Sequence, residues 1–228
     1  QSTPAEAAST GTTLELPTVE VVATTPLTGT GIDVDRVPST VTIISAEEFN
    51  RLHSFSTIDA LVQYTPSANS TDVQGNAFFQ DFRFRGFAAS PLQGTPQGLA
   101  VYQNGIRVNE AFGDTVNWDL IPEVAIDRAE VFTNNPALGG AVSIQMKNGF
   151  TYHGFEGSVQ GGSFGQIGGS IQYGGEKDGV GLYIAADAVR DDGWRKQSPS
   201  ELARFYGDLG WKGDKGELHL VASAASNS

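Results

Sequence analysis

The sequence predicts an α+β domain followed by a run of antiparallel β-strands, and three regions of different composition along the chain support this fold class. Residues 1–36 are rich in Thr, Ser, Gly and Pro, which is typical of a flexible tether. Residues 37–149 mix helix and strand signals, whereas residues 150–228 alternate apolar and polar side chains between glycines. We therefore divide the chain into a tether, an α+β domain and a strand-rich region at these boundaries.

The α+β domain is predicted to begin with an apolar strand at Val41–Ile44, followed by two short helices. Ser45 and Glu48 have the spacing of a capping box, in which the two side chains satisfy backbone N–H groups at the start of a helix. The second helix is expected to begin at Ser56 and to stop at Pro66, because a proline disrupts the hydrogen bonding of a helix interior.

Four strand-like segments complete the domain, and one of them contains a turn. Asn104 and Gly105 tolerate the positive φ of a two-residue hairpin turn, so the segment around them is predicted to fold back on itself. Strands arranged around two short helices form a small α+β unit. The strand-like segments are FRFRGF (82–87), GLAVYQNGIRVN (98–109), AEVF (129–132) and AVSIQMK (141–147).

The last region is predicted to consist of amphipathic strands of about ten residues each. A tilted strand of this length crosses a bilayer, but a soluble β-sandwich shows the same alternation, and the pattern leaves both possibilities open. In residues 181–189 one face carries Leu182, Ile184, Ala186 and Ala188, and the other carries Tyr183, Ala185, Asp187 and Val189.

The composition argues against several classes of function. A net charge of -12 and a pI of about 4.5 do not suit a nucleic-acid partner, since phosphate binding needs a basic face. The sequence has no cysteine, and His53, His153 and His219 lack the spacing of metal ligands. The glycine-rich segment 161–169 lacks the lysine of a phosphate-binding loop. We expect no enzymatic activity, no metal site and no cofactor.

Five features occur in a fixed order along residues 37–147. A strand and two helices (37–68) are followed by Arg85-Gly86-Phe87, Asn104-Gly105, Arg128-x-Glu130-Val131 and Gly139-Gly140-Ala141-Val142. In this order the sequence resembles the TonB-dependent outer-membrane transporters, and the resemblance continues into the early strands of the last region.

The resemblance implies a plug domain at residues 37–149, followed by the start of a transmembrane antiparallel β-barrel. The family barrel has about 22 strands, of which about five are expected in residues 150–228. Because five strands would leave unpaired edges in lipid, we expect the sequence to be the N-terminal part of a longer protein. The implied location is the outer membrane of a Gram-negative bacterium, in contact with outer-membrane lipid.

The sequence departs from the family pattern in the loop that precedes Gly139 and Gly140. The family usually has a longer loop here than the segment Thr133–Leu138 provides. Either the loop is reduced in this protein, or several residues between Pro136 and Ala137 are absent from the sequence. We favour the second interpretation.

The tether contains an extended segment that matches the TonB box, which the inner-membrane protein TonB captures in this family by adding a strand. An unpaired extended segment offers its backbone N–H and C=O groups to a sheet edge, and alternate side chains set the register. The alternative is a sticky patch of tether without a partner. The predicted TonB-binding residues are Thr18, Val19, Glu20, Val21, Val22, Ala23 and Thr24.

Three charged residues of the plug match the ion pairs that lock plug to barrel in this family. Arg85 and Arg128 lie in or beside apolar strand-like segments, so their burial inside a barrel would require carboxylate partners. Glu130 is the candidate partner within this chain, and glutamates of the barrel wall would lie beyond residue 228. Ordinary structural ion pairs are the alternative interpretation.

Ligand contacts in the family come from loops of the plug and barrel that face outside. The matching plug loops are residues 88–98 and 109–118, in which Gln93, Phe112, Asp114 and Trp118 are the candidate substrate-binding residues. The implied activity is TonB-dependent uptake of a scarce large ligand, most plausibly a ferric siderophore, powered through ExbB–ExbD. Cobalamin, haem, a sugar or another metal complex is the alternative cargo, and a soluble periplasmic binding or adhesion module is the alternative of another class.

Overall fold

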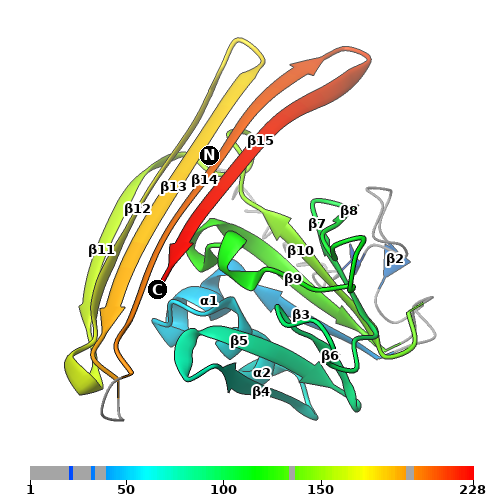
Figure 1. Cartoon of the computed structure of the whole chain (residues 1–228). Helices are drawn as coiled ribbons and strands as arrows, with labels where there is room; N and C mark the ends of the chain where they lie inside the picture. The colour runs from blue at the N-terminus through cyan, green and yellow to red at the C-terminus, as the bar shows by residue number, and fades with distance from the viewer. Residues whose placement is uncertain (1–20, 23–31, 34–39, 134–136, 194–197) are drawn as a thin grey trace, which may run out of the picture.

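The computed structural model of the protein describes residues 21–22, 32–33, 40–133, 137–193 and 198–228. Figure 1 shows a mixed α/β domain beside a sheet of long strands. Most of the predicted tether lies outside the described residues, as do Thr18, Val19, Glu20, Ala23, Thr24 and the loop residues 134–136. Within the tether, β1 (Val21–Val22) pairs with β2 (Ile32–Asp33) in antiparallel fashion.

A five-stranded mixed sheet forms the centre of the plug, with the strand order β3-β9-β10-β7-β8. The pairing of β10 with β7 is parallel, and the other pairings are antiparallel. The predicted segments are therefore strands, although their order in space could not be read from their order in the chain. The strands are β3 (Val41–Ser45), β7 (Leu99–Gln103), β8 (Ile106–Arg107), β9 (Ile126–Phe132) and β10 (Gly140–Met146).

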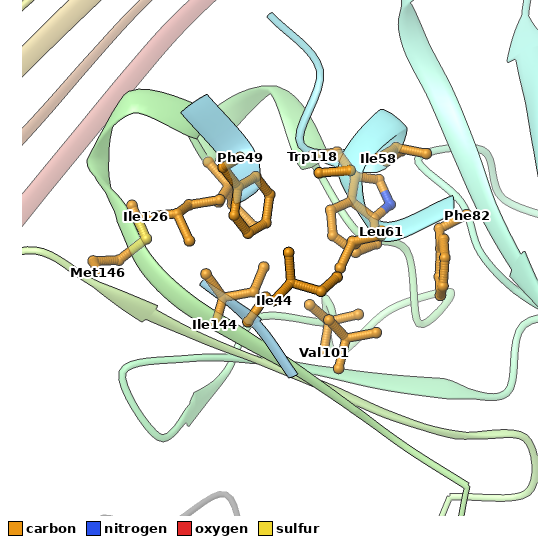
Figure 2. Packing of buried hydrophobic residues seen from close by; sticks show 14 of the residues in the cluster. Ile44, Phe49, Ile58, Leu61, Phe82, Val101, Trp118, Ile126, Ile144 and Met146 are labelled. Carbon is orange, nitrogen blue, oxygen red and sulfur yellow. The ribbon is translucent and has the colours of Figure 1, made fainter. Parts of the chain in front are cut away.

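Two short helices, α1 (Ala46–Leu52) and α2 (Thr57–Tyr64), belong to the same core as this sheet. The predicted capping box is confirmed, because the Glu48 N–H donates to the Ser45 hydroxyl and the Ser45 N–H donates to the Glu48 carboxylate. Figure 2 shows the apolar side chains that meet between helices and strands. Their burial supplies most of the stabilisation of such a domain. Fully buried members include Ile44, Phe49, Ile58, Leu61, Phe82, Val101, Ile126 and Ile144.

A second, three-stranded sheet is formed by β4 (Ala68–Val73), β5 (Asn76–Phe84) and β6 (Phe87–Ala89). Its hairpins turn at Gln74-Gly75 and Arg85-Gly86, where both residues of each pair have positive φ. The predicted turn at Asn104-Gly105 between β7 and β8 is confirmed and has the same signature. Positive φ at both central residues is the geometry of the tight turn that matches the twist of its two strands.

The five remaining strands form one antiparallel meander, in which each strand pairs with the next in the chain. They contain 8 to 14 residues each, as expected for tilted strands that cross a bilayer. The expected number of about five strands is confirmed, and the sheet is open rather than closed into a barrel. The strands are β11 (Gly154–Gly161), β12 (Ile167–Lys177), β13 (Val180–Asp191), β14 (Ser200–Gly213) and β15 (Gly216–Asn227).

The two faces of this meander differ in their chemistry. The face toward the plug buries polar side chains such as Gln172, Asp187, Arg204 and Asp208. The opposite face is apolar and exposed, which is typical of a lipid-facing surface. No helix among the described residues has the length and apolar character needed to cross a membrane. The exposed apolar residues include Phe155, Val159, Ile171, Leu182, Ile184, Phe205, Trp211, Leu218 and Leu220.

Short helical turns complete the description of the chain. The 3-10 turns η2 (Trp118–Leu120) and η3 (Glu123–Ala125) connect the loop after β8 to β9. Both contact strands of the meander, η2 with β14 and β15 and η3 with β12 and β13. A third turn, η4 (Ser163–Gly165), joins β11 to β12. The segment 118–125 is therefore a main area of contact between plug and meander.

Candidate functional site

The interface between plug and meander contains one buried ion pair on the meander side. The Arg204 Nη2 atom of β14 lies 2.8 Å from the Asp187 Oδ2 atom of β13, and the side chains are 3% and 2% exposed. The two residues are direct partners in the register of the two strands. Rigid strands therefore hold both charges in place, and each charge compensates the desolvation of the other.

The guanidinium of Arg204 also reaches the backbone of the plug. Its Nη2 atom donates to the carbonyl oxygen of Phe55 at 2.8 Å, and its Nη1 atom donates to the carbonyl oxygen of Ile121 at 3.3 Å. Phe55 lies between the two helices and Ile121 lies between η2 and η3. One arginine of the meander thus binds two plug segments that are far apart in the sequence.

A buried carboxyl group of the plug lies beside this ion pair. Glu123 is 8% exposed, and a polar cavity of about 140 Å³ is lined by Glu123, Asp187 and Arg204 among others. Burial raises the pKa of Glu123 to about 8, and the nearby charge of Asp187 adds to this rise while that of Arg204 opposes it. The carboxyl group is therefore mostly protonated, and so neutral, near pH 7.

A second set of hydrogen bonds joins the end of the plug to the meander. The Lys147 Nζ atom donates to the carbonyl oxygen of Val124 at 2.8 Å and to the Gln172 Oε1 atom at 3.2 Å. The Tyr183 hydroxyl donates to the same Gln172 oxygen at 2.8 Å. Asn104, in the confirmed hairpin turn, donates to the hydroxyl oxygen of Tyr206 at 3.2 Å. Polar contacts thus extend over β12, β13 and β14.

The structure brings two of the predicted lock residues together within the plug. Arg128 Nη2 lies 2.8 Å from Glu130 Oε1, and the Glu130 side chain is 1% exposed. Both residues lie on β9, two positions apart, and so on one face of the strand. This ion pair belongs to the central sheet of the plug.

The burial of Arg85 inside a barrel stays a prediction, since the described meander has five strands. Arg85 occupies the first position of a tight turn with φ of 54°, is exposed, and donates through Nη1 to the carbonyl oxygen of Thr133 at 2.9 Å. The apolar neighbours Phe84 and Phe87 belong to the two strands that the turn connects, so they do not bury the residue between them.

The two predicted ligand loops adjoin each other. A Cβ atom on Gly113 would lie 3.0 Å from the Gln93 Cγ atom, so the Gln93 side chain lies against the other loop. Phe112 is 77% exposed there. Asp114 forms a half-exposed ion pair with Arg107, at 2.7 Å between Oδ1 and Nη2. Gln93, Phe112 and Asp114 therefore lie in one exposed region of the plug.

Trp118 is not part of this exposed region, and its prediction as a direct ligand contact is corrected. Its side chain is buried, with only 5% exposed, and its Nε1–H donates to the carbonyl oxygen of Ala89 at 2.9 Å. The ring packs edge-on against Phe82 and lies near Ile58 and Leu61 (Figure 2). A tryptophan side chain can either contact a ligand or pack in a core, provided that its N–H finds an acceptor. Here the ring packs in the core and the carbonyl group of Ala89 is that acceptor.

Sequence reasoning missed Arg204 and Glu123, although a signal for Arg204 was present. The alternation along residues 181–189 places Asp187 on the polar face, and Arg204 is a basic residue in the next strand of the meander. An acidic and a basic residue at facing positions of neighbouring strands favour an ion pair. Nothing local marks Glu123, because its burial depends on the whole interface.

Comparisons with known proteins identify the plug. Residues 33–145 match the family model described as TonB-dependent Receptor Plug Domain. None of the curated protein sequences that were compared matches the chain at a significant level.

Solved structures with the same fold are outer-membrane receptors. The pyoverdine outer membrane receptor FpvA from Pseudomonas aeruginosa is 17% identical, with a TM-score of 0.65 over 91% of this chain and 30% of the receptor. BauA, the ferric preacinetobactin receptor from Acinetobacter baumannii, is 16% identical, with a TM-score of 0.62 over 87% of this chain and 29% of the receptor. The chain thus spans less than a third of the length of these receptors. The plug match and these structural matches show that the chain belongs to the TonB-dependent receptors. It carries their plug domain and a few strands of their barrel.

Proposed function

We propose that the protein is an energy-coupled outer-membrane transporter that takes up a scarce, large ligand of the ferric siderophore class. The observation that supports this function best is the plug itself, which packs on the polar face of a meander whose other face is apolar. A soluble binding or adhesion module would have to cover that apolar face. The receptors for pyoverdine and preacinetobactin, which have the same fold, favour a siderophore as cargo.

The proposed mechanism involves no covalent chemistry. Ligand binds at the exposed region around Gln93, Phe112 and Asp114, and the segment Thr18–Thr24 becomes available to TonB. TonB adds a strand to this segment, and force from ExbB–ExbD displaces the plug. The pairing of Val21 with Asp33 and of Val22 with Ile32 supports this proposal, because these two residues already pair as a strand. TonB would replace β2 in that role.

The lock function of Arg85, Arg128 and Glu130 remains a prediction, since the barrel glutamates that it requires would lie beyond residue 228. The Arg128–Glu130 pair supports it in part, because an almost fully buried carboxylate fixes the position of this arginine. Arg85 could take part only from its exposed turn.

Growth experiments test the proposed function and its alternatives. A strain that lacks the protein should fail to grow on one ferric siderophore as sole iron source and should recover when the gene is restored. The panel includes haem, and parallel cultures depend on cobalamin or on a sugar. Unimpaired growth of the deletion strain on every source, under conditions in which the protein is expressed, would contradict uptake as its function.

Phe112 and Trp118 should respond differently to replacement by alanine. Phe112→Ala removes an exposed ring, so ligand affinity is expected to fall while the stability of the plug stays within about 0.5 kcal/mol. Trp118→Ala leaves a cavity in the core and should destabilise the plug by about 3–5 kcal/mol. Ligand titration and hydrogen exchange of the plug amides measure the two effects. Loss of plug stability in Phe112→Ala would contradict its assignment to the exposed region.

A further inference from the structure

The ion pair of Arg204 and Asp187 has a feature that the family resemblance does not imply. There, a plug arginine pairs with a barrel carboxylate, whereas here the arginine belongs to the meander and its plug partners are backbone carbonyls. We propose that Arg204 is a residue of the barrel wall that retains the plug, binding its carbonyls at Phe55 and Ile121 while Asp187 orients the guanidinium. We define the plug clamp as the four residues Phe55, Ile121, Arg204 and Asp187.

Asp187 alone holds the Arg204 guanidinium in one orientation, without help from the plug. The Nε atom of Arg204 lies 2.9 Å and 3.2 Å from the two carboxylate oxygens of Asp187, and Nη2 lies 2.8 Å from one of them. The planar fork of an arginine can satisfy a carboxylate along one edge and still offer N–H groups to other acceptors. The remaining donor capacity points at the plug.

Both plug carbonyls lie at junctions of the plug. The carbonyl oxygen of Ile121 also accepts a hydrogen bond from the Thr57 Oγ1 atom at 2.9 Å, so the start of α2, the segment after η2 and the meander meet at one atom. These acceptors are backbone carbonyl groups, so a side-chain substitution at Phe55 or Ile121 does not remove them. The plug side of the clamp is therefore insensitive to side-chain identity, and its strength depends on Arg204.

An apolar contact lies next to the hydrogen bonds. The ring of Phe55 is buried against Val189 and Leu202 of the meander. Gly168 on β12 makes room for this ring, because a Cβ atom there would lie 2.5 Å from the Phe55 Cζ atom. The same short segment of the plug is thus held by Arg204 at its carbonyl and by an apolar socket at its side chain.

The cavity beside the clamp marks the place where solutes would pass between plug and meander if the clamp were lost. Its volume is about 140 Å³, and it is lined by plug residues that include Phe55 and Glu123 and by polar residues of the meander that include Glu156, Ser158 and Gln172. A cavity of this size with polar lining residues has room for water. Without the clamp, this gap would widen into a path for small solutes.

The experiment compares variants of the full-length receptor in the outer membrane. Arg204→Met should raise the entry of a small hydrophilic antibiotic about tenfold or more, since two hydrogen bonds from a charged donor are lost. For the same reason it should speed amide exchange at residues 55–57, 121 and 123–125. Arg204→Lys should give an intermediate leak, because an ammonium group can pair with Asp187 without reaching both carbonyls. Arg190→Met is the matched control, since Arg190 lies on the exposed face of β13.

A double variant separates loss of the clamp from the effect of an unpaired charge. Arg204→Met leaves Asp187 buried without its partner, whereas Arg204→Met with Asp187→Leu removes both charges. We expect the double variant to form a heat-modifiable barrel and still to leak. A wild-type level of leak in the double variant would overturn the proposal, as would an equal leak in Arg190→Met. Failure of Arg204→Met to assemble, both alone and combined with Asp187→Leu, would also overturn it, because Arg204 would then stabilise the wall itself rather than the docked plug.

The readout does not depend on the proposed cargo or on TonB. Antibiotic entry and amide exchange report the seal alone, whereas failure of the uptake hypothesis would appear as unimpaired growth of the deletion strain. The two outcomes are therefore distinguishable.

Discussion

Replacing Val21 by proline is expected to abolish ligand uptake while leaving ligand binding nearly intact. Proline removes a backbone N–H donor and fixes φ, so that a strand can no longer be added at this position. Val21 belongs to the predicted TonB-binding segment and lies on β1, whose backbone pairs with β2. The proposed ligand-binding region around Phe112 is untouched by the change. Transport of radiolabelled ferric siderophore, compared with its binding to whole cells, measures the two effects separately.

A proline elsewhere in the tether provides the control. Ala7→Pro makes the same chemical change in residues 1–36 but outside the segment Thr18–Thr24. We expect normal uptake from this variant. Uptake by Val21→Pro at the rate of the parent protein would show that the segment is not the site of strand addition, and the proposed role of all seven residues would then fail.

The second large effect concerns pH. We expect docking of the plug to weaken as pH rises from about 4.5 to about 8, because Glu123 has a pKa of about 8 when docked and an ordinary value of 4.5 in water. A group with a raised pKa binds its proton more tightly in the docked state, so its stabilising effect is complete below pH 4.5 and is lost through the window up to pH 8. One such proton changes the docking equilibrium by at most about tenfold per pH unit.

The cause of this pH dependence lies mainly in burial, with several charges acting on the same carboxyl group. Asp187 and Asp59 raise the pKa of Glu123, while Arg204 and Lys147 lower it. These groups belong to β13, α2, β14 and the end of the plug, so charges from both the plug and the meander act on this carboxyl group.

Glu123→Gln tests the assignment. Glutamine keeps the size and the neutral charge of the protonated acid, so docking should become nearly independent of pH over this range. Exchange of the amides at residues 121 and 123–125, followed from pH 5 to pH 8 and corrected for intrinsic exchange, measures the effect. Asp127→Asn, an exposed carboxyl group four residues along the chain, should retain the pH dependence of the parent. A pH dependence unchanged by Glu123→Gln would assign the titration to another group.

The sequence by itself determined the features that depend on neighbours a few positions away. The capping box of Ser45 and Glu48 closes within one helical turn, and the hairpin turn of Asn104 and Gly105 needs only two residues with positive φ. The alternation in residues 181–189 defined the two faces of β13, since side chains of a strand point to opposite sides. These features follow from backbone geometry and local hydrogen bonding, so they do not depend on how distant segments pack.

The tertiary structure alone decided which side chains are buried and which charges meet. Trp118 is a core residue because its ring packs against Phe82 and its N–H donates to the carbonyl group of Ala89, whereas Arg85 lies in a turn and donates to the carbonyl group of Thr133. Arg204 holds carbonyl groups at Phe55 and Ile121 that no sequence pattern marks as partners. Desolvation and long-range pairing depend on how sheets and loops stack, and residues far apart in the chain become neighbours only when that packing is complete.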